Sequence, residues 1–248
     1  MNQLDLQGRC AIVTGGASGL GLAITQRLVQ SGAKVSVWDL DPQKMTEVVS
    51  ALGKQVQVDR VDVSRIEQVE AAFARTLSAF GRVDALVCSA GIAGPTAPSW
   101  EYSVADWIRV NEVNVNGVFF CCRTVVPHMI QNGYGRIVNM ASVAGKEGNA
   151  NSSGYSASKA AVIGFTKALA RETIRSGVIV NSVAPAAVRT AIFDQLTQEH
   201  IDAALSKIPM GRFGKPEEIA ALVAWACTEE CSFTSGAAFD LSGGRATY

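Results

Sequence analysis

A short apolar run from Cys10 to Thr14 passes through a glycine-rich turn directly into a helical pattern that ends at Gly32. The run CAIVT is apolar almost throughout, which is typical of a strand buried on both faces of a parallel sheet. In the segment LAITQRLVQSG, the apolar residues recur at helical spacing. A buried strand that leads at once into a helix predicts the first unit of an α/β fold, because parallel strands need a helical crossover between them.

The same alternation continues along the chain. Further strands are expected at residues 34–40, 55–63, 82–91, 135–142, 177–185 and 237–241. Helices are expected at 41–53, 64–80 and 104–131, around Tyr155, and from Pro216. This order predicts a parallel sheet with right-handed crossovers. No long linker, low-complexity tract or repeat interrupts it, so we expect a single domain over residues 1–248.

The glycine-rich turn indicates a cofactor site. Gly15, Gly19 and Gly21 give the spacing G-x-x-x-G-x-G, and glycines in such a turn let the backbone approach a pyrophosphate at the helix N-terminus. The spacing differs from the usual G-x-G-x-x-G, and a purely structural turn is the alternative. The strand–turn–helix context favours a dinucleotide.

Asp39 lies at the end of the second expected strand, eighteen residues after Gly21. A carboxylate there can accept hydrogen bonds from both ribose hydroxyls of NAD and repels the 2′-phosphate of NADP. An ordinary strand-end turn residue is the alternative. Read together with the glycines, Asp39 predicts NAD as the cofactor, with NADP as the less favoured choice.

Tyr155 and Lys159 are four residues apart, so on a helix their side chains lie on the same face. A charge pair about 4 Å apart interacts by roughly 4 kcal/mol at an intermediate dielectric, equal to about three pKa units. We therefore expect Lys159 to lower the pKa of Tyr155 towards the range useful for proton transfer. Ser142, thirteen residues before Tyr155, could donate a hydrogen bond to the substrate oxygen with which Tyr155 exchanges a proton. A tyrosine ring packed under a solvated lysine is the alternative.

The motifs T-G-G-A-S-G-L-G at Thr14–Gly21 and Y-x-x-x-K at Tyr155 and Lys159 resemble the short-chain dehydrogenase/reductase family over nearly the whole chain. The resemblance is to its single-domain branch, which includes 3-oxoacyl-carrier-protein reductase-like enzymes and sugar and polyol dehydrogenases. It implies a Rossmann-type, doubly wound parallel sheet of about seven strands with helices on both faces. It also implies an NAD(P)-dependent oxidoreductase acting on CH–OH groups, with a proton relay and a homotetramer.

The resemblance also assigns roles to residues. Tyr155 looks like the general acid/base, Ser142 the substrate-oxygen donor, and Lys159 the residue that lowers the pKa of the tyrosine and holds the nicotinamide ribose. Asn114 matches the asparagine that anchors a relay water, with Asn111 and Asn116 as competitors. Asp62 resembles an adenine-contacting aspartate, although a helix cap is an equal reading. The remaining expected cofactor contacts are Ser18, Leu20, Val63, Ala90, Gly91, Pro185, Val188 and Thr190.

Two positions depart from the family pattern. The usual Asn-Asn-Ala-Gly after the fourth strand is Cys88-Ser89-Ala90-Gly91 here, which puts the asparagine's stabilising role in doubt. Ala186 stands where glycine is common, and alanine is strained at a positive φ. We expect effects on cofactor affinity only.

The composition bears on the binding partners, the metal sites and the cellular location of the protein. Lysine plus arginine equals aspartate plus glutamate, 22 against 22, which favours neither a nucleic-acid nor a membrane partner. Two histidines and six cysteines without paired spacing predict no metal site. The first residues lack a signal peptide's features, and no 18-residue apolar run follows, so we expect a cytoplasmic protein.

The sequence indicates the class of substrate less directly than it indicates the cofactor. The segment after Ser142 is polar and borders the substrate in this family, which favours a small polar substrate such as a sugar acid, polyol or hydroxy acid. A substrate lid is expected at about residues 186–214. The alternatives are a 3-oxoacyl-carrier-protein reductase-like enzyme using NADPH and, more remotely, a non-catalytic dinucleotide sensor.

Overall fold

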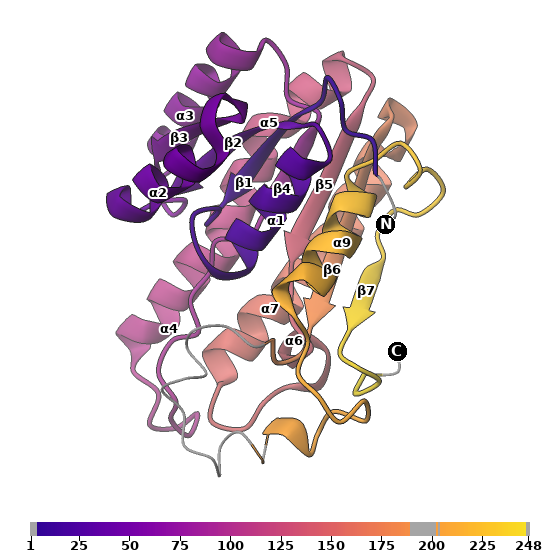
Figure 1. Ribbon diagram of the computed structural model, residues 1–248. Coiled ribbons are helices and arrows are strands. Elements are labelled where there is room, and N and C mark those ends of the chain that lie inside the picture. The colour runs from indigo at the N-terminus through magenta and orange to yellow at the C-terminus, as the bar shows by residue number, and fades with distance from the viewer. Residues whose placement is uncertain (1–3, 189–201, 203, 247–248) are drawn as a thin grey trace.

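The computed structural model describes residues 4–188, 202 and 204–246. Its centre is a seven-stranded sheet in which each strand is parallel to its neighbours, in the order β3-β2-β1-β4-β5-β6-β7 (Figure 1). The strands are β1 (Cys10–Thr14), β2 (Lys34–Asp39), β3 (Val56–Arg60), β4 (Ala85–Cys88), β5 (Gly135–Met140), β6 (Val178–Pro185) and β7 (Ala238–Leu241). The predicted Rossmann-type sheet is confirmed.

The strand order reverses at β1. This strand pairs with β2 on one side, where Cys10 is opposite Lys34, and with β4 on the other, where Ala11 is opposite Ala85. Connections therefore leave the carboxyl ends of β1 and β4 in opposite directions and open a crevice between them, the usual ligand position in such sheets.

Helices cover both faces of the sheet (Figure 1). One face carries α1 (Gly19–Gln30), α2 (Pro42–Leu52) and α9 (Pro216–Ala226), which share a buried apolar core with the sheet. The opposite face carries α3 (Ile66–Phe80), α5 (Gly117–Gln131) and α7 (Ser153–Thr173), with a second core. The strands are buried on both sides, as their apolar sequences require.

The helix predicted over residues 104–131 is not continuous. It consists of α4 (Val104–Asn111), a π-helical turn η2 (Glu112–Asn116) and α5. The extra residue of the π-turn leaves no mark on the apolar periodicity, so the pattern predicts only one long helix. Such turns inside α-helices are frequent at functional sites, and this one contains Asn114.

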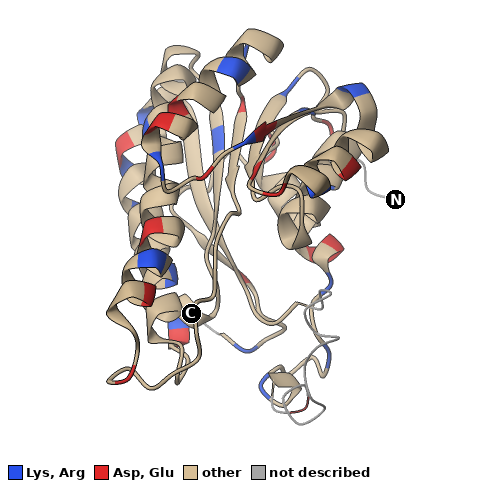
Figure 2. Ribbon diagram, turned by 90° about the vertical axis from the view of Figure 1, so that its left-hand side faces the viewer, with Lys and Arg blue, Asp and Glu red and all other residues tan. Residues whose placement is uncertain are grey.

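Charges of both signs are interspersed along the helices, while the strands carry few of them (Figure 2). This mixture agrees with the balanced charge of the sequence. None of the described helices combines the length and hydropathy needed to cross a bilayer. Within the same described residues, no cluster of three or more His, Cys, Asp or Glu side chains has the arrangement of a metal site.

Candidate active site

A cavity of about 1080 Å³ lies at the carboxyl ends of the central strands. It extends from the glycine turn after β1 to the first turn of α7, and a cavity of this size suits an extended ligand. The predicted site residues that line it are Gly15, Ser18, Gly19, Leu20, Gly21, Ala90, Gly91, Ser142, Tyr155, Lys159, Pro185 and Val188. We call it the main cavity.

The glycine turn depends on close backbone contacts. Gly15 has φ +63°, and a Cβ added there would lie 2.9 Å from the Cα of Ala90. A Cβ on Gly21 would collide with the carbonyl of Gly15, so α1 can approach the turn only through glycine. Gly19, with φ +51°, has open space beside it.

The amino end of α1 opens into the main cavity. The helix begins at Gly19, and its N-cap Ser18 makes no side-chain hydrogen bond to the first turn. The first N–H groups of a helix have no intrahelical acceptor and attract anions. The bare backbone, the helix N-terminus and the adjoining space fit the pyrophosphate of a dinucleotide.

Asp39 supports this turn without lining the main cavity. Its Oδ2 accepts a hydrogen bond from the N–H of Ala17 at 3.0 Å. Its Oδ1 accepts from the N–H groups of Leu40 and Asp41 at 2.8 and 3.2 Å. Three of the roughly four acceptor positions of the carboxylate are therefore used by backbone, which the sequence did not indicate.

The segment Cys88–Gly91, which departs from the family pattern, is held by Thr14. The Thr14 Oγ1 accepts hydrogen bonds from the N–H groups of Ser89 and Ala90, each at 3.0 Å. Ala186 is unstrained, because Asn151 alone has a positive φ among the described residues other than glycine. The strain expected at Ala186 is therefore absent.

Tyr155 lies in the first turn of α7, and Ser142 lies just after β5. Burial raises the pKa of the Tyr155 phenol, and a hydrogen bond with Ser142 lowers it in part. The Lys159 ammonium lies 5.6 Å from the centre of the Tyr155 ring and donates to the Met140 carbonyl at 2.6 Å. The expectation that Lys159 brings the pKa of Tyr155 below its usual value is wrong for this arrangement, because burial raises that pKa and the group that lowers it in part is Ser142.

Lys159 is itself buried, and burial lowers the pKa of its ammonium to about 8. The group is 5% exposed and lies at the wall of the main cavity, close to the amide oxygen of Asn114 across Gly91. A lysine with this pKa remains largely protonated at neutral pH, so a positive charge is present beside Tyr155.

Asn114 does not line the main cavity but lies directly behind its wall. Its Oδ1 accepts from the N–H of Ile92 at 2.8 Å, and its Nδ2 donates to the Ile92 carbonyl at 2.9 Å. Nδ2 also donates to Ser158 Oγ at 3.0 Å. The side chain is fully buried, and both of its amide hydrogens are bound directly to protein groups, which leaves Oδ1 as its only side-chain atom able to contact a relay water.

The other predicted cofactor contacts have different positions. The carboxylate of Asp62 accepts hydrogen bonds from the N–H and hydroxyl of Ser64 and pairs with Arg109 at 3.5 Å. These contacts hold the loop before α3 but do not cap that helix, because its N-cap is Arg65, without a side-chain hydrogen bond to the first turn. Burial raises the pKa of Asp62, but these hydrogen bonds and Arg109 hold it below the usual value. Val63 is buried against Gly117. Neither residue lines the main cavity, and Thr190 lies outside the described residues.

Several lining residues were not predicted. Ala17 and Ser89 lie within motifs already noted and could have been inferred from their neighbours, as could Met140 and Ala141 before Ser142. Lys44 and Glu47 of α2 have no motif that would reveal them. The full unpredicted set is Ala17, Leu22, Lys44, Glu47, Ser89, Ile92, Ala93, Met140, Ala141, Ala186 and Pro216.

The polar segment after Ser142 contacts the C-terminal segment instead of lining the main cavity. Arg245 donates to Glu147 Oε2 at 2.8 Å and to Asn149 Oδ1 at 3.1 Å. Lys146 lies 3.9 Å from Asp240. The polarity of this segment is therefore explained largely by internal ion pairs, and it is weaker support for a polar substrate than the sequence suggested.

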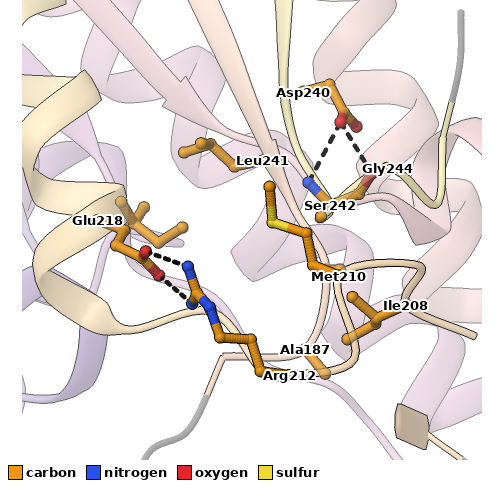
Figure 3. A pocket seen from close by; sticks show the side chains of 13 residues that line it. Ala187, Ile208, Met210, Arg212, Glu218, Asp240, Leu241, Ser242 and Gly244 are labelled. Carbon is orange, nitrogen blue, oxygen red and sulfur yellow. Dashed lines mark hydrogen bonds and ion pairs between the residues drawn. The ribbon is translucent and has the colours of Figure 1, made fainter. Parts of the chain in front are cut away.

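A smaller cavity of about 280 Å³ adjoins the end of β7 and shares Ala186 with the main cavity. Ile208, Met210 and Leu241 form its apolar wall, as Figure 3 shows. At the edge of this cavity, Arg212 is paired through two hydrogen bonds with Glu218 (Figure 3). Of the predicted lid, residues 189–201 and 203 lie outside the described part of the chain.

The family profile described as short chain dehydrogenase matches residues 9–201. The chain belongs to this family. It is therefore an oxidoreductase acting on CH–OH groups, as predicted from the sequence. The relatives of this chain within the family act on different substrates, as their names show.

The chain is 52% identical to a 2-dehydro-3-deoxy-L-rhamnonate dehydrogenase (NAD(+)) of a Sphingomonas species, over 97% of this chain and 96% of the relative. It is 38% identical to the 3-oxoacyl-[acyl-carrier-protein] reductase FabG of Thermotoga maritima, over 97% and 99%. Among solved short-chain dehydrogenase-like folds, the crystal structure of gox2181 aligns with a TM-score of 0.94 at 33% identity, covering 97% and 96% of the two chains.

Proposed function

We propose that this short-chain dehydrogenase uses NAD to interconvert a secondary alcohol and a ketone on a small polar substrate, and that the substrate is a sugar acid. The observation that carries the proposal is the meeting of Ser142, Tyr155 and Lys159 with the glycine turn in one cavity. When bound, NAD supplies the hydride acceptor. The residues of the chain bind the substrate oxygen and transfer its proton.

Ser142 and Tyr155 face the place of the reacting oxygen. The Ser142 hydroxyl is partly engaged with the N–H of Ala144 at 3.1 Å, and its hydrogen bonding to Tyr155 favours the phenolate. In alcohol oxidation, Ser142 holds the substrate oxygen while Tyr155 accepts its proton in the phenolate form, which Ser142 and Lys159 stabilise. In ketone reduction, Tyr155 returns that proton.

Lys159 provides the positive charge of the site. Its ammonium lies at the wall of the main cavity, which Met140 and Gly91 also line, and there it would hold the nicotinamide ribose of a bound dinucleotide. A phenolate formed on Tyr155 is stabilised by this cation, so Lys159 acts most strongly when the proton is being transferred. We assign it this electrostatic role and the binding of the ribose hydroxyls.

Asn114 remains the proposed relay residue of the catalytic set, and Asp62, Val63 and Thr190 remain proposed cofactor contacts. Asn114 lies behind the wall of the main cavity, whereas Asp62 stabilises the loop before α3 through Ser64 and Arg109. For Asp39, a remaining acceptor position can receive a ribose hydroxyl, and its charge opposes a 2′-phosphate. This supports NAD over NADP.

The sugar-acid substrate is supported by the 52% identity to an enzyme with such a substrate, over almost the full length of both chains. The competing reading, a 3-oxoacyl-carrier-protein reductase-like enzyme using NADPH, is supported by 38% identity to FabG. Asp39 argues against it.

One assay separates these functions. NADH formation or consumption is followed at 340 nm, about the usual absorbance wavelength of reduced nicotinamide, with 2-keto-3-deoxy sugar acids and their reduced forms, polyols, hydroxy acids and 3-oxoacyl thioesters. We expect the highest kcat/KM with NAD and a sugar acid. Preference for NADPH with a 3-oxoacyl thioester would establish the alternative, and dinucleotide binding without turnover on any substrate would point to a sensor.

We also propose a single domain and a cytoplasmic homotetramer. Exposed apolar side chains on α4 and α5, including Trp107, Ile108 and Phe119, support an interface between copies. The six cysteines are buried and unpaired, which fits a reducing compartment. Light scattering coupled to size exclusion tests the tetramer directly.

A further inference from the structure

The first turn of α7 has weak local support. The helix begins at Ser153, so Tyr155 is its third residue, and the N-cap Ser152 makes no side-chain hydrogen bond to the turn. The opening turn of a helix is its least constrained part, because its first N–H groups have no intrahelical acceptors. The position of Tyr155 must therefore depend on contacts with other elements.

Ser158 makes one such contact from within the same helix. Its hydroxyl donates to the carbonyl of Tyr155 at 2.7 Å and accepts from Asn114 Nδ2 at 3.0 Å. The side chain is fully buried. Both the hydrogen and an acceptor position of this hydroxyl are used, so Ser158 joins the backbone of Tyr155 to the π-turn η2.

Asn114 continues the connection to the wall of the main cavity. Its amide pairs with both the N–H and the carbonyl of Ile92, at 2.8 and 2.9 Å, and Ile92 lines the main cavity. A continuous series of hydrogen bonds thus runs from Ile92 through Asn114 and Ser158 to the carbonyl of Tyr155. Buried networks in which each polar group is satisfied fix one geometry, because any displacement breaks several bonds.

We propose that Ser158 is a positioning residue that fixes Tyr155 relative to the cavity wall at Ile92. The proposal rests on the acid–base role of Tyr155 given above. Proton transfer requires the phenol within hydrogen-bond distance of the substrate oxygen, and small displacements of a reacting group reduce rates strongly. Removing the Ser158 hydroxyl should therefore slow turnover more than it weakens cofactor binding.

Thr166 offers a matched control on the same helix. Its hydroxyl donates to the Val162 carbonyl at 2.8 Å and accepts from Asn139 Nδ2 at 3.0 Å, and its side chain is fully buried. Ser158→Ala and Thr166→Val each delete a hydroxyl with the same two kinds of bond. Only the first deletion affects a network that reaches Tyr155.

The test compares both variants with the native enzyme by thermal unfolding, NADH binding and steady-state kinetics. We expect similar losses of Tm and a Kd for NADH within about twofold of native in both. We expect kcat to fall about 10- to 100-fold in Ser158→Ala and to stay within about threefold of native in Thr166→Val, with the KM for NAD little changed. Equal kcat values for the two variants would overturn the proposal.

Two further variants complete the design. Ser158→Cys keeps a side chain of similar size with a weaker donor and acceptor, so its kcat should lie between those of native enzyme and Ser158→Ala. A native kcat in Ser158→Cys would contradict the proposal even if Ser158→Ala failed to fold. Tyr155→Phe tests the proposed function separately: turnover in that variant would refute the acid–base role, whereas its inactivity together with normal Ser158 variants would refute only the positioning role.

Discussion

The two ends of the main cavity are constructed in different ways. At the glycine turn, the backbone itself forms the surface, since Gly15 lies against Ala90 and Gly21 lies against Gly15. At the catalytic end, side chains from separate elements meet: Asn114 comes from η2, Ser142 follows β5, and Tyr155 lies on α7. The first end depends on the absence of Cβ atoms, and the second depends on hydrogen bonds between distant segments.

This contrast predicts different consequences of substitution. Changes at the catalytic end should lower turnover and leave dinucleotide binding in place. Changes at the glycine turn should weaken dinucleotide binding first. Single substitutions should therefore separate the two ends of the main cavity.

The largest effect is expected for Tyr155→Phe. The variant lacks the group that accepts and returns the proton, and general acid–base catalysis contributes about 10²- to 10⁴-fold. We expect kcat to fall by about 10³-fold, while titration of NADH by fluorescence gives a nearly native Kd.

Tyr134→Phe is the matched control for this prediction. The Tyr134 hydroxyl is buried and makes no hydrogen bond to any described residue, and its ring lies beside Arg9 and Arg136, away from the main cavity. Its kcat should be native. A comparable loss in both variants would show that the Tyr155 effect is not specific to the catalytic end.

The next effect is expected for Gly21→Ala. The new Cβ collides with the Gly15 carbonyl, so α1 must move away from the turn that holds the pyrophosphate. We expect the Kd for NAD, measured by calorimetry, to rise about 10- to 100-fold, which corresponds to about 1.4–2.7 kcal/mol.

Gly164→Ala controls for the intrinsic effect of replacing a helical glycine. Gly164 lies within α7, and a Cβ there meets no atom within 4 Å. This substitution should raise stability by about 0.5–1 kcal/mol without changing cofactor affinity. A normal Kd for NAD in Gly21→Ala would mean that the close contact at the turn does not control the site.

The difference between the two ends also explains what the sequence could reveal. The turn, the strands and the helix α1 follow from residues close together in the chain, and their prediction was confirmed. The residues Ser142, Tyr155 and Lys159 line one cavity, because the alternation of elements places their segments at one edge of the sheet.

Details that depend on packing between distant elements could not be predicted. Apolar spacing does not distinguish the π-turn at Asn114 from a regular helix. The balance between burial and charge that sets the pKa of Tyr155 depends on the depth of the phenol, which a four-residue spacing does not show. The ion pairs of Glu147 with Arg245 join segments about a hundred residues apart, a pairing that no local pattern indicates.

A smaller loss of cofactor affinity is expected for Asp39→Ala, which removes a support of the glycine turn. The variant loses the hydrogen bond to the N–H of Ala17 as well as a ribose acceptor. We expect the KM for NAD to rise about tenfold, with a lower Tm and little gain in activity with NADP, because the turn itself is loosened.

Asp41→Ala is the control, since Asp41 caps α2 by accepting from the N–H groups of Gln43 and Lys44. It should lose about 1 kcal/mol of stability and retain its KM for NAD. Efficient use of NADP by Asp39→Ala, with an unchanged Tm, would show that Asp39 serves only to discriminate between cofactors.

The smallest effect is the contribution of Lys159 to the pH dependence of stability. Burial lowers the pKa of this amine to about 8 in the folded protein, from the model-compound value of 10.5. Between these values Lys159 binds more protons in the unfolded chain than in the folded one, so its own contribution to the free energy of unfolding should rise with pH in this window, by at most about 1.4 kcal/mol per pH unit. Burial also raises the pKa of the thiols of Cys88, Cys121 and Cys227 above the usual 9, which opposes the rise within the same window, and it raises the pKa of Tyr155, which opposes it at higher pH.

Urea unfolding of native protein, Lys159→Met and Lys167→Met between about pH 7.5 and 9.5 measures this contribution. Lys167 lies on the same helix with its side chain exposed, so Lys167→Met should follow the native curve. The stability of the native protein minus that of Lys159→Met should rise with pH, since only the native protein carries the buried amine and both carry the same thiols. Parallel curves for all three proteins would mean that the Lys159 ammonium is solvated in the folded state, and the catalytic end would then lack the buried charge that distinguishes it from the glycine turn.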